Sequence, residues 1–254
     1  MKNIINQYIK PIIYCSVLLT MMVASCKQDD YYIDGGKADP KFKGNMMEYL
    51  ESNPKFDTIA QIVKLAGMEE AFKNEDLTFF APTDEVIRRT IGIYSSGGLN
   101  RDLFDLGKDT IKVLSDVQPE IWRKYLTRYL FKGKMTAKDY PQLDFTLKPL
   151  YPGGFYRGYN KDLANIGVVY NPVNGVNYIG YRQLSFSYIP DSANPDNFLP
   201  AAVASSDIQP TNGVIHVLAV ATGDLYFIGE TMQSFAANIY GFDGEFFTDV
   251  ILSK

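Results

Sequence analysis

The sequence predicts a single α+β domain, because helical and strand patterns occupy different parts of the chain. Apolar residues recur at helical spacing in residues 57–66 and 120–131. From residue 143 onward, short apolar runs that are rich in β-branched and aromatic residues alternate with Pro, Gly and Asn turns. With 46% hydrophobic and 21% charged residues, the chain of 254 residues can bury a sizeable core.

The helical part is organised around a short buried strand at residues 77–80. Pro82 ends this strand, and either Thr83 or Asp84 can cap the helix that begins at Glu85. The strand, its stop and the capped helix follow one another so closely that they predict a rigid corner.

Two helices are expected before this corner. One starts at Met46 and closes at Pro54, and the other is capped by Asp57 and ended by Gly67. A turn over residues 68–72 then leads into the strand.

A further helix is expected after the corner, over residues 120–131. Trp122 is the only tryptophan, and it lies in the apolar stripe of this helix, so a core role explains it better than a ligand platform does. The preceding residues 91–119 include a Ser- and Gly-rich stretch, and we expect them to form a surface insertion.

Strands dominate the rest of the domain. They are expected over residues 143–150, 166–170, 178–189, 198–203 and 212–218. The last of these starts at an Asn-Gly turn, and the sequence N-P-V-N-G between the second and third is typical of a hairpin loop.

The C-terminal extension, residues 226–254, follows the last of these strands. We expect a helix over residues 231–240. Phe242, Phe246 and Phe247 make the tail apolar, so the extension is expected to pack back on the domain.

Two of these segments together resemble the paired hallmark segments of the fasciclin-like domain. They are residues 77–87, L-T-F-F-A-P-T-D-E-V-I, and residues 212–218, N-G-V-I-H-V-L. The similarity extends upstream through residues 56–59 and 65–68, and it covers residues 46–225 with the insertion as a gap. The resemblance implies a β-sandwich or wedge of short strands with several flanking helices. It also implies adhesion or binding rather than catalysis.

One position departs from the family pattern. Tyr129 matches the place where the family usually carries a Tyr-His pair, but Leu130 stands where the histidine is expected. In animal relatives this region is linked to integrin binding, so the departure argues against that role here.

The N-terminus resembles the signal of bacterial lipoproteins. Two lysines precede an apolar stretch over residues 12–23 that is too short to span a bilayer comfortably, and the sequence V-A-S-C follows, ending at Cys26. The resemblance implies a signal peptide of residues 1–25, a diacylglycerol on Cys26 and a lipidated tether over residues 26–45. An ordinary signal peptide or an uncleaved anchor is the alternative.

The run K-Q-D-D over residues 27–30 resembles a surface-export signal of Gram-negative lipoproteins. Such a polar run is also an ordinary solvated tether. On the first interpretation the protein lies at the outer membrane, exposed at the cell surface, with membrane lipid as its partner through Cys26.

Charge and cysteine content exclude several classes of function. A net charge of −4 without a basic run gives no electrostatic footprint for nucleic acid. Cys15 and Cys26 are the only cysteines, so a chain cleaved and acylated at Cys26 has no thiol for a disulfide, a thiolate metal site or a nucleophile.

The sequence offers no set of residues that identifies an enzyme. His216 is the only histidine, which excludes a His-rich metal site, and its place in a strand favours a structural role over that of a catalytic base. Neither a G-x-S-x-G elbow nor a Gly-rich phosphate loop is present. A pair of facing carboxylates stays open, but nothing in the sequence places one. We therefore expect no cofactor, no metal and no catalysis.

Aromatic residues are dense between residues 151 and 188 and are interleaved with glycines. Cross-strand packing explains most of them. Phe155, Tyr156 and Tyr159 lie beside Gly and Pro, which indicates loop exposure. We therefore expect these three residues to bind the ligand, which is a protein or a glycan at the cell surface.

Three functions are compatible with these observations. The first is an adhesion or protein-interaction module, and the second is an accessory glycan-binding lipoprotein of an outer-membrane nutrient-uptake system. The third is a hydrolase on an elaborated scaffold. Neighbouring genes for a transporter and glycosidases would favour the second, and a cleft with two facing carboxylates would favour the third.

Overall fold

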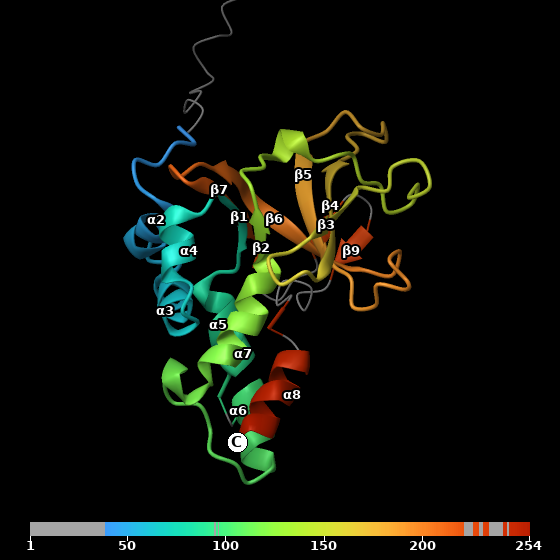
Figure 1. Ribbon diagram of the computed structural model, residues 1–254. Coiled ribbons are helices and arrows are strands. Elements are labelled where there is room, and N and C mark those ends of the chain that lie inside the picture. The colour runs from blue at the N-terminus through green and yellow to red at the C-terminus, as the bar shows by residue number, and fades with distance from the viewer. Residues whose placement is uncertain are drawn as a thin grey trace, which may run out of the picture. The chain divides into compact units, whose positions relative to one another are not determined.

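In the part of the chain that the structure describes, six α-helices and one strand follow one another over residues 46–126, and another helix begins at residue 244 (Figure 1). The α-helices are α2 (Met46–Ser52), α3 (Asp57–Leu65), α4 (Glu69–Asn74), α5 (Asp84–Ile91), α6 (Leu99–Asp105), α7 (Pro119–Leu126) and α8 (Gly244–Ser253). The short 3-10 helices are η1 (Leu114–Asp116), η2 (Thr127–Tyr129) and η3 (Ala137–Asp139).

The computed structural model describes residues 39–93, 95, 97–220, 226–228, 231–233, 241–242 and 244–254, without the side chains of Leu199 and of residues 226–228 and 231–233. The predicted signal peptide and Cys26 therefore lie outside the described residues. Of the helices in the described ranges, none has the length and apolar character needed to cross a membrane.

Seven strands of the described chain form one sheet in the order β2-β1-β7-β6-β5-β4-β3. They are β1 (Leu77–Ala81), β2 (Leu130–Lys132), β3 (Gly154–Arg157), β4 (Leu163–Tyr170), β5 (Arg182–Tyr188), β6 (Leu199–Ile208) and β7 (Gly213–Leu218). Neighbours are antiparallel except for β1 and β7, which run parallel. A separate hairpin pairs β8 (Tyr226–Ile228) with β9 (Thr231–Gln233).

The sheet folds over at β6, which serves two partners. Its first part pairs with β5, and its second part pairs with β7. The register with β7 shifts between Val203 and Ser205 and again between Ser205 and Ile208. Such irregularities bend a strand and increase its twist, so the two halves of the sheet can turn toward each other.

Aromatic side chains fill the interior between these halves. Phe80 of β1 stacks on Phe186 of β5 with ring centroids 4.3 Å apart, and Phe131 of β2 lies edge-on to both, at 5.7 and 5.8 Å. All three rings are buried. The α+β class and the wedge of short strands are therefore confirmed.

The opposite side of β1 faces the helices. Phe79, which points away from Phe80, meets Phe72 of α4 at 5.2 Å in an edge-on contact. Figure 1 shows α2 and α4 beside β1 and β7. Every residue of β1 is buried, as expected for a strand covered on both faces.

Asn212, in the turn before β7, joins the helices to the sheet. Its Oδ1 accepts a hydrogen bond from the amide of Met46 at 2.7 Å. Its Nδ2 donates to the carbonyls of Phe72 at 2.9 Å and Glu75 at 3.0 Å. The predicted Asn-Gly turn is therefore also a connection between the start of α2, the end of α4 and the sheet.

The residues predicted to cap α3 and α5 do not cap these helices as expected. Asp84 does not cap its own helix: its Oδ1 accepts hydrogen bonds from the amides of Thr58 at 2.9 Å and Ile59 at 3.1 Å, at the start of α3. Phe56 occupies the N-cap of α3, and Asp57 is the first helical residue. The corner brings the starts of α3 and α5 together, so a carboxylate on one helix caps the other.

The predicted tether ends earlier than expected. Residues 40–45 are joined to the domain, because the amide of Phe42 donates to the carbonyl of Gln209 at 2.9 Å and the amide of Gln209 donates to the carbonyl of Pro40 at 2.7 Å. Asn45 forms a capping box with Glu48 at the start of α2. These contacts give residues 40–45 a fixed place, which a solvated linker would not have.

The predicted surface insertion, residues 91–119, contributes to the core instead. Leu99 and Leu103 of α6 are buried, as are Ile111 and Val117. Asn100 holds the segment together, since its side chain bonds the amide and the carbonyl of Ile111 at 2.7 and 2.9 Å. Of the Ser- and Gly-rich stretch, Ser95, Gly97 and Gly98 lie in the short connection before α6.

Some predicted elements have different boundaries or types. The helix expected over residues 120–131 ends at Leu126, and the chain continues through η2 into β2, which pairs with β1. The strand expected over residues 143–150 is a turn, and β3 was missed. The helix expected over residues 231–240 is wrong where it can be compared, because residues 231–233 form β9; residues 234–240 lie outside the described residues.

The end of the chain packs on α7. Phe242 and Phe246 are fully buried against Trp122, at ring distances of 5.9 and 5.3 Å. Trp122 donates from its indole nitrogen to the carbonyl of Leu114 at 2.9 Å, and its predicted core role is confirmed. The C-terminal aromatic residues therefore complete the helical core.

Candidate binding surface

Exposed apolar side chains gather on two loops beside the β4–β5 hairpin. One loop, residues 143–151, precedes β3, and the other, residues 171–181, joins β4 to β5. Their exposed apolar members, which we call the apolar rim, are Leu147, Leu150, Val173, Val176, Ile179 and Tyr181. They are 41–65% exposed. Single exposed apolar residues are ordinary, whereas six on two adjoining loops mark a candidate interaction site.

A tight turn explains why two rim residues stand at the hairpin tip. Val173 and Val176 exchange two backbone hydrogen bonds of 3.0 Å. Asn174 and Gly175 between them have φ of +51° and +77°, the conformation that an Asn-Gly hairpin turn requires. The hairpin loop predicted over residues 171–175 is therefore confirmed, and it presents two valines to solvent.

Between the loops lies a cavity of about 190 Å³. Its apolar lining includes Phe145, Leu147, Tyr170, Pro172 and Tyr178. Its polar lining comes from the side chains of Asp144, Thr146 and Asn177. Among these lining residues Asp144 carries the only charge, so the cavity offers a single carboxylate and not the pair that a glycosidase needs.

Asp144 fixes the two loops to each other. Its Oδ1 accepts hydrogen bonds from the amides of Thr146 at 2.8 Å and Leu147 at 2.9 Å, which folds its own loop into a turn. Its Oδ2 accepts from the hydroxyl of Tyr178 at 2.9 Å on the other loop. Tyr178 has φ of +69°, which is uncommon for a bulky residue, and its ring packs edge-on against Tyr151 at 5.7 Å.

These hydrogen bonds keep the carboxylate charged. Burial alone raises the pKa of Asp144, but the amides of Leu147 and Thr146 and the hydroxyl of Tyr178 stabilise the ionised form. The net effect lowers the pKa of Asp144 below its ordinary value. At neutral pH the cavity therefore contains a fixed negative charge.

The structure changes the surroundings predicted for Phe155, Tyr156 and Tyr159. Phe155 and Tyr156 lie on strand β3 and not in a loop, whereas Tyr159 lies in the turn after this strand; Phe155 is 44% exposed. Tyr156 packs on the core and meets Tyr140 edge-on at 5.3 Å, and the hydroxyl of Tyr159 donates to Glu75 at 3.1 Å. The predicted loop is wrong for Phe155 and Tyr156, and both tyrosines are half-buried where exposure was expected. A ligand-binding role for the three residues stays a prediction.

Gly154 accounts for this error. A Cβ at Gly154 would lie 2.6 Å from the ring of Tyr156, so the glycine makes room for that ring as it lies back along the strand. The glycines around residue 155 had indicated a loop, but at Gly154 the glycine allows close packing. The sequence signal for the apolar rim is weaker than the glycines and prolines beside Phe155, Tyr156 and Tyr159, since it consists of branched apolar residues within a turn-rich stretch.

His216 has the surroundings of a structural histidine. It is fully buried, its Nε2 lies 3.0 Å from the carbonyl of Met135, and its Nδ1 accepts from the amide of Asp207 at 3.3 Å. Burial lowers the pKa of His216, so the ring stays neutral. In the described ranges no group of three His, Cys, Asp or Glu residues could hold a metal ion.

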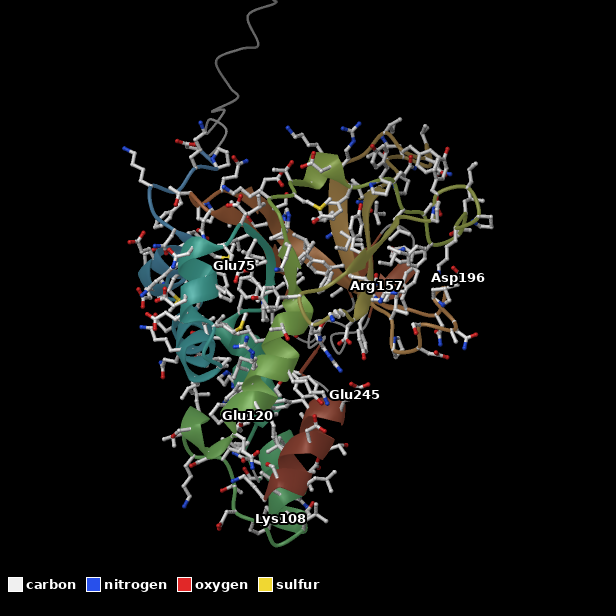
Figure 2. The ribbon with its side chains drawn as sticks, viewed as in Figure 1. Glu75, Lys108, Glu120, Arg157, Asp196 and Glu245 are labelled. Atoms are coloured by element: carbon white, nitrogen blue, oxygen red, sulfur yellow. The ribbon has the colours of Figure 1, made fainter. Side chains whose placement is uncertain are left out.

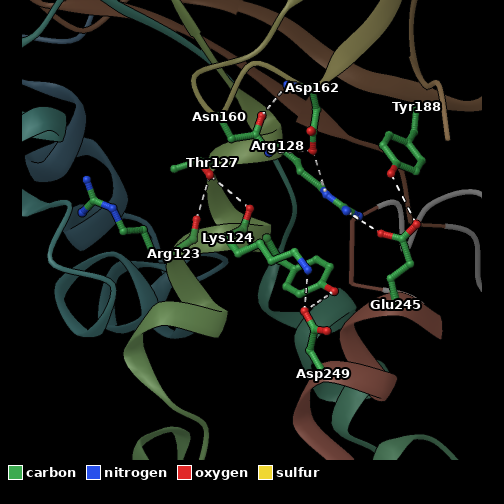
Figure 3. Close-up of polar contacts among 10 residues, drawn as sticks. Arg123, Lys124, Thr127, Arg128, Asn160, Asp162, Tyr188, Glu245 and Asp249 are labelled. Atoms are coloured by element: carbon green, nitrogen blue, oxygen red, sulfur yellow. Dashed lines mark hydrogen bonds and ion pairs between the residues drawn. The ribbon is translucent and has the colours of Figure 1, made fainter. Parts of the chain in front are cut away.

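A charged cluster around Arg128 serves packing (Figure 3). Arg128 lies between the rings of Tyr125 and Tyr188, 4.6 and 4.8 Å from their centroids, and pairs with Asp162 at 3.2 Å and with Glu245. Figure 2 places Glu245 at the start of α8. Arg128 is 5% exposed, so a buried cation is neutralised by carboxylates from two other elements.

A second ion pair extends this link along α8. Lys124 and the hydroxyl of Tyr125 both donate to Asp249, at 2.6 and 2.8 Å. Burial and the bond to Asp249 raise the pKa of Tyr125 above its ordinary value, so its hydroxyl keeps its proton. These groups satisfy one another, which favours a structural role in joining α8 to α7.

Comparison with known proteins shows which protein family the chain resembles. Residues 54–221 match the family model described as the Fasciclin domain. Among solved structures the chain is similar to a FAS1 domain pair from the insect cell adhesion molecule Fasciclin I, at 18% identity and a TM-score of 0.42. The match covers 69% of this chain and 49% of that one, so the chain spans about half the length of that structure. A search among curated proteins gave no match.

Proposed function

Because the chain belongs to the fasciclin domain family, we propose that it is a non-catalytic binding protein of the cell envelope that works in adhesion. Fasciclin domains occur in cell adhesion proteins, which is consistent with a binding role. The observation that carries the proposal for this chain is the apolar rim. Six exposed apolar side chains on the two loops that border a small cavity are the surface expected of a protein that binds another macromolecule.

The proposal includes attachment through Cys26. A diacylglycerol on this residue would hold the domain at the outer membrane, and the acidic run after it would direct the protein to the cell surface. A protein at the cell surface is the first candidate partner. Attachment of many copies to one membrane would make weak individual contacts effective, because linked binding events raise the apparent affinity.

A glycan-binding accessory protein of a nutrient-uptake system is the second candidate. It is favoured by the hydrogen-bonding side chains of Asp144 and Asn177, which lie beside the rings of Tyr170 and Tyr178 in the cavity. Such rings could stack on a sugar while the polar groups bond its hydroxyls.

The rim can be tested with a double variant, Val176→Ser with Ile179→Ser. Both side chains are more than half exposed, so we expect the melting temperature to stay within about 2 °C while adhesion falls at least about tenfold. The measurement is binding of beads that carry the mature protein to cells of the source organism. Leu252→Ser is the matched control, because Leu252 is 78% exposed on α8. Equal adhesion of the double variant and the control would refute the role of the rim.

The anchor is tested by Cys26→Ala. Without the thiol there is no acceptor for the diacylglycerol, so we expect an unprocessed chain without acyl groups and loss of membrane retention after washing. Mass spectrometry of the N-terminal peptide measures both processing and acylation. A mature, non-acylated terminus in the unaltered protein would overturn the lipoprotein proposal.

A further inference from the structure

We propose that the cavity between the two loops receives an arginine side chain of the protein partner, with its guanidinium group on Asp144. This inference rests on the proposed binding role of the apolar rim, and it names the chemistry of the residue at the centre of that contact.

The size of the cavity favours one side chain. At about 190 Å³ it is far larger than the roughly 10–15 Å³ that a single water needs, yet it is smaller than the roughly 300 Å³ at which drug-sized ligand pockets begin. A small anchor pocket with apolar residues around it is the usual arrangement of a binding hot spot, because the surrounding contacts exclude water.

The charge of the cavity favours a cation. Asp144 supplies the only charge among the lining residues, which disfavours phosphate, sulfate or a carboxylate as the occupant. Two nearby cations each lie over an aromatic ring, and one of these rings, that of Tyr170, lines the cavity. Lys148 lies 4.0 Å from the ring centroid of Phe198, and the guanidinium of Arg182 lies 4.6 Å from that of Tyr170. Neither lines the cavity.

Toward the residues that the structure describes, the Asp144 carboxylate keeps one hydrogen-bonding position without a partner. A carboxylate has about four acceptor sites, and three are taken by the two amides on Oδ1 and the Tyr178 hydroxyl on Oδ2. The remaining site is on Oδ2. Because the loop holds Asp144 in place before binding, a cation can pair with it without the cost of ordering a flexible side chain.

The walls suit arginine in particular. Its apolar stem can lie along Leu147 and Pro172, and its planar group can stack on an aromatic ring such as Phe145 or Tyr178. Flanking apolar residues of the partner would then meet the apolar rim. The expected partner segment is therefore an exposed arginine between apolar residues.

Saturation-transfer NMR on the acylated full chain in lipid nanodiscs tests this inference, with N-acetyl-arginine amide as the probe. N-acetyl-citrulline amide is the matched control, because it has the same shape without the charge. We expect transfer to the arginine methylene protons, at least about tenfold weaker binding of citrulline, and weaker arginine binding at high salt.

Two variants separate binding from folding. Asp144→Asn keeps an oxygen for the amides of Thr146 and Leu147 but removes the charge, and we expect at least about tenfold weaker arginine binding. Tyr178→Phe removes the hydroxyl that occupies Oδ2 and leaves Asp144 free, so arginine binding should be kept or improved. If Asp144 only held the loops together, both variants would lose binding alike.

Several results would overturn the inference. They are equal binding of citrulline, unchanged binding in Asp144→Asn, loss of binding in both variants, or saturation transfer to a methyl glycoside in place of arginine. If arginine fails to bind while the Val176→Ser and Ile179→Ser variant still loses adhesion, the inference falls and the proposed function stands. If that double variant adheres normally, the proposed function falls.

Discussion

Phe246→Ala is expected to lower the free energy of unfolding by about 3–5 kcal/mol, the usual cost of deleting a buried phenylalanine ring. Phe246 is fully buried and meets Trp122 at 5.3 Å, Tyr125 at 5.2 Å and Phe242 at 5.4 Å. The space left by the deleted ring cannot easily close, because the neighbouring aromatic rings are rigid. Urea denaturation followed by tryptophan fluorescence measures the loss, since Trp122 is the only tryptophan and lies beside the altered site.

The control for this prediction lies on the same helix. Leu252 is 78% exposed, so Leu252→Ala should change the free energy of unfolding by less than about 0.5 kcal/mol. A loss at Phe246 no larger than the loss at Leu252 would mean that α8 does not belong to the folded core.

Asn212→Ala is expected to destabilise the protein by about 3 kcal/mol. The substitution removes three hydrogen bonds of 2.7 to 3.0 Å, each of which contributes about 1 kcal/mol. It also leaves the amide of Met46 and the carbonyl of Phe72 without these partners in a buried region. Denaturant unfolding measures the loss, and hydrogen exchange of the Met46 amide reports whether the start of α2 opens first.

An exposed asparagine provides the comparison. Asn197 lies in the loop before β6, with its side chain exposed, so Asn197→Ala should leave the free energy of unfolding within about 0.5 kcal/mol of the original. A similarly small effect at Asn212 would show that water replaces its three hydrogen bonds at little cost.

Local patterns predicted much of the fold. The apolar run of β1, its stop at Pro82 and the Asn-Gly turn before β7 are each specified by neighbouring residues, and all three are found. The resemblance to the fasciclin family was carried by the same segments. The α+β class could therefore be reached without knowledge of any long-range contact.

The errors come from interactions between distant segments. Asp84 is a good capping residue in any context, but the helix it caps lies 26 positions earlier in the chain. Residues 143–150 have strand-like composition, yet Asp144 bonds the amides of its own loop and bends it away from the sheet. Sequence periodicity does not report such partners.

The candidate binding surface was predicted least well. Tyr156 and Tyr159 were expected to be exposed, but Tyr140 and Glu75, which come from other parts of the chain, hold them. The apolar rim combines two loops that are separate in the sequence and are joined in the fold by contacts such as the bond from Tyr178 to Asp144. Exposure is a property of the folded surface, so composition alone could not locate it.

The parallel pairing of β1 with β7 has a consequence for synthesis. Leu77 to Ala81 pair with residues 213–217, so β1 lacks one neighbour until the ribosome has made a further stretch of more than a hundred residues. During that time the unpaired backbone N–H and C=O groups of the strand L-T-F-F-A form an open edge, which is a template for aggregation. The protein is therefore expected to depend on a chaperone while it is being made, and to refold slowly because its central contact spans most of the domain.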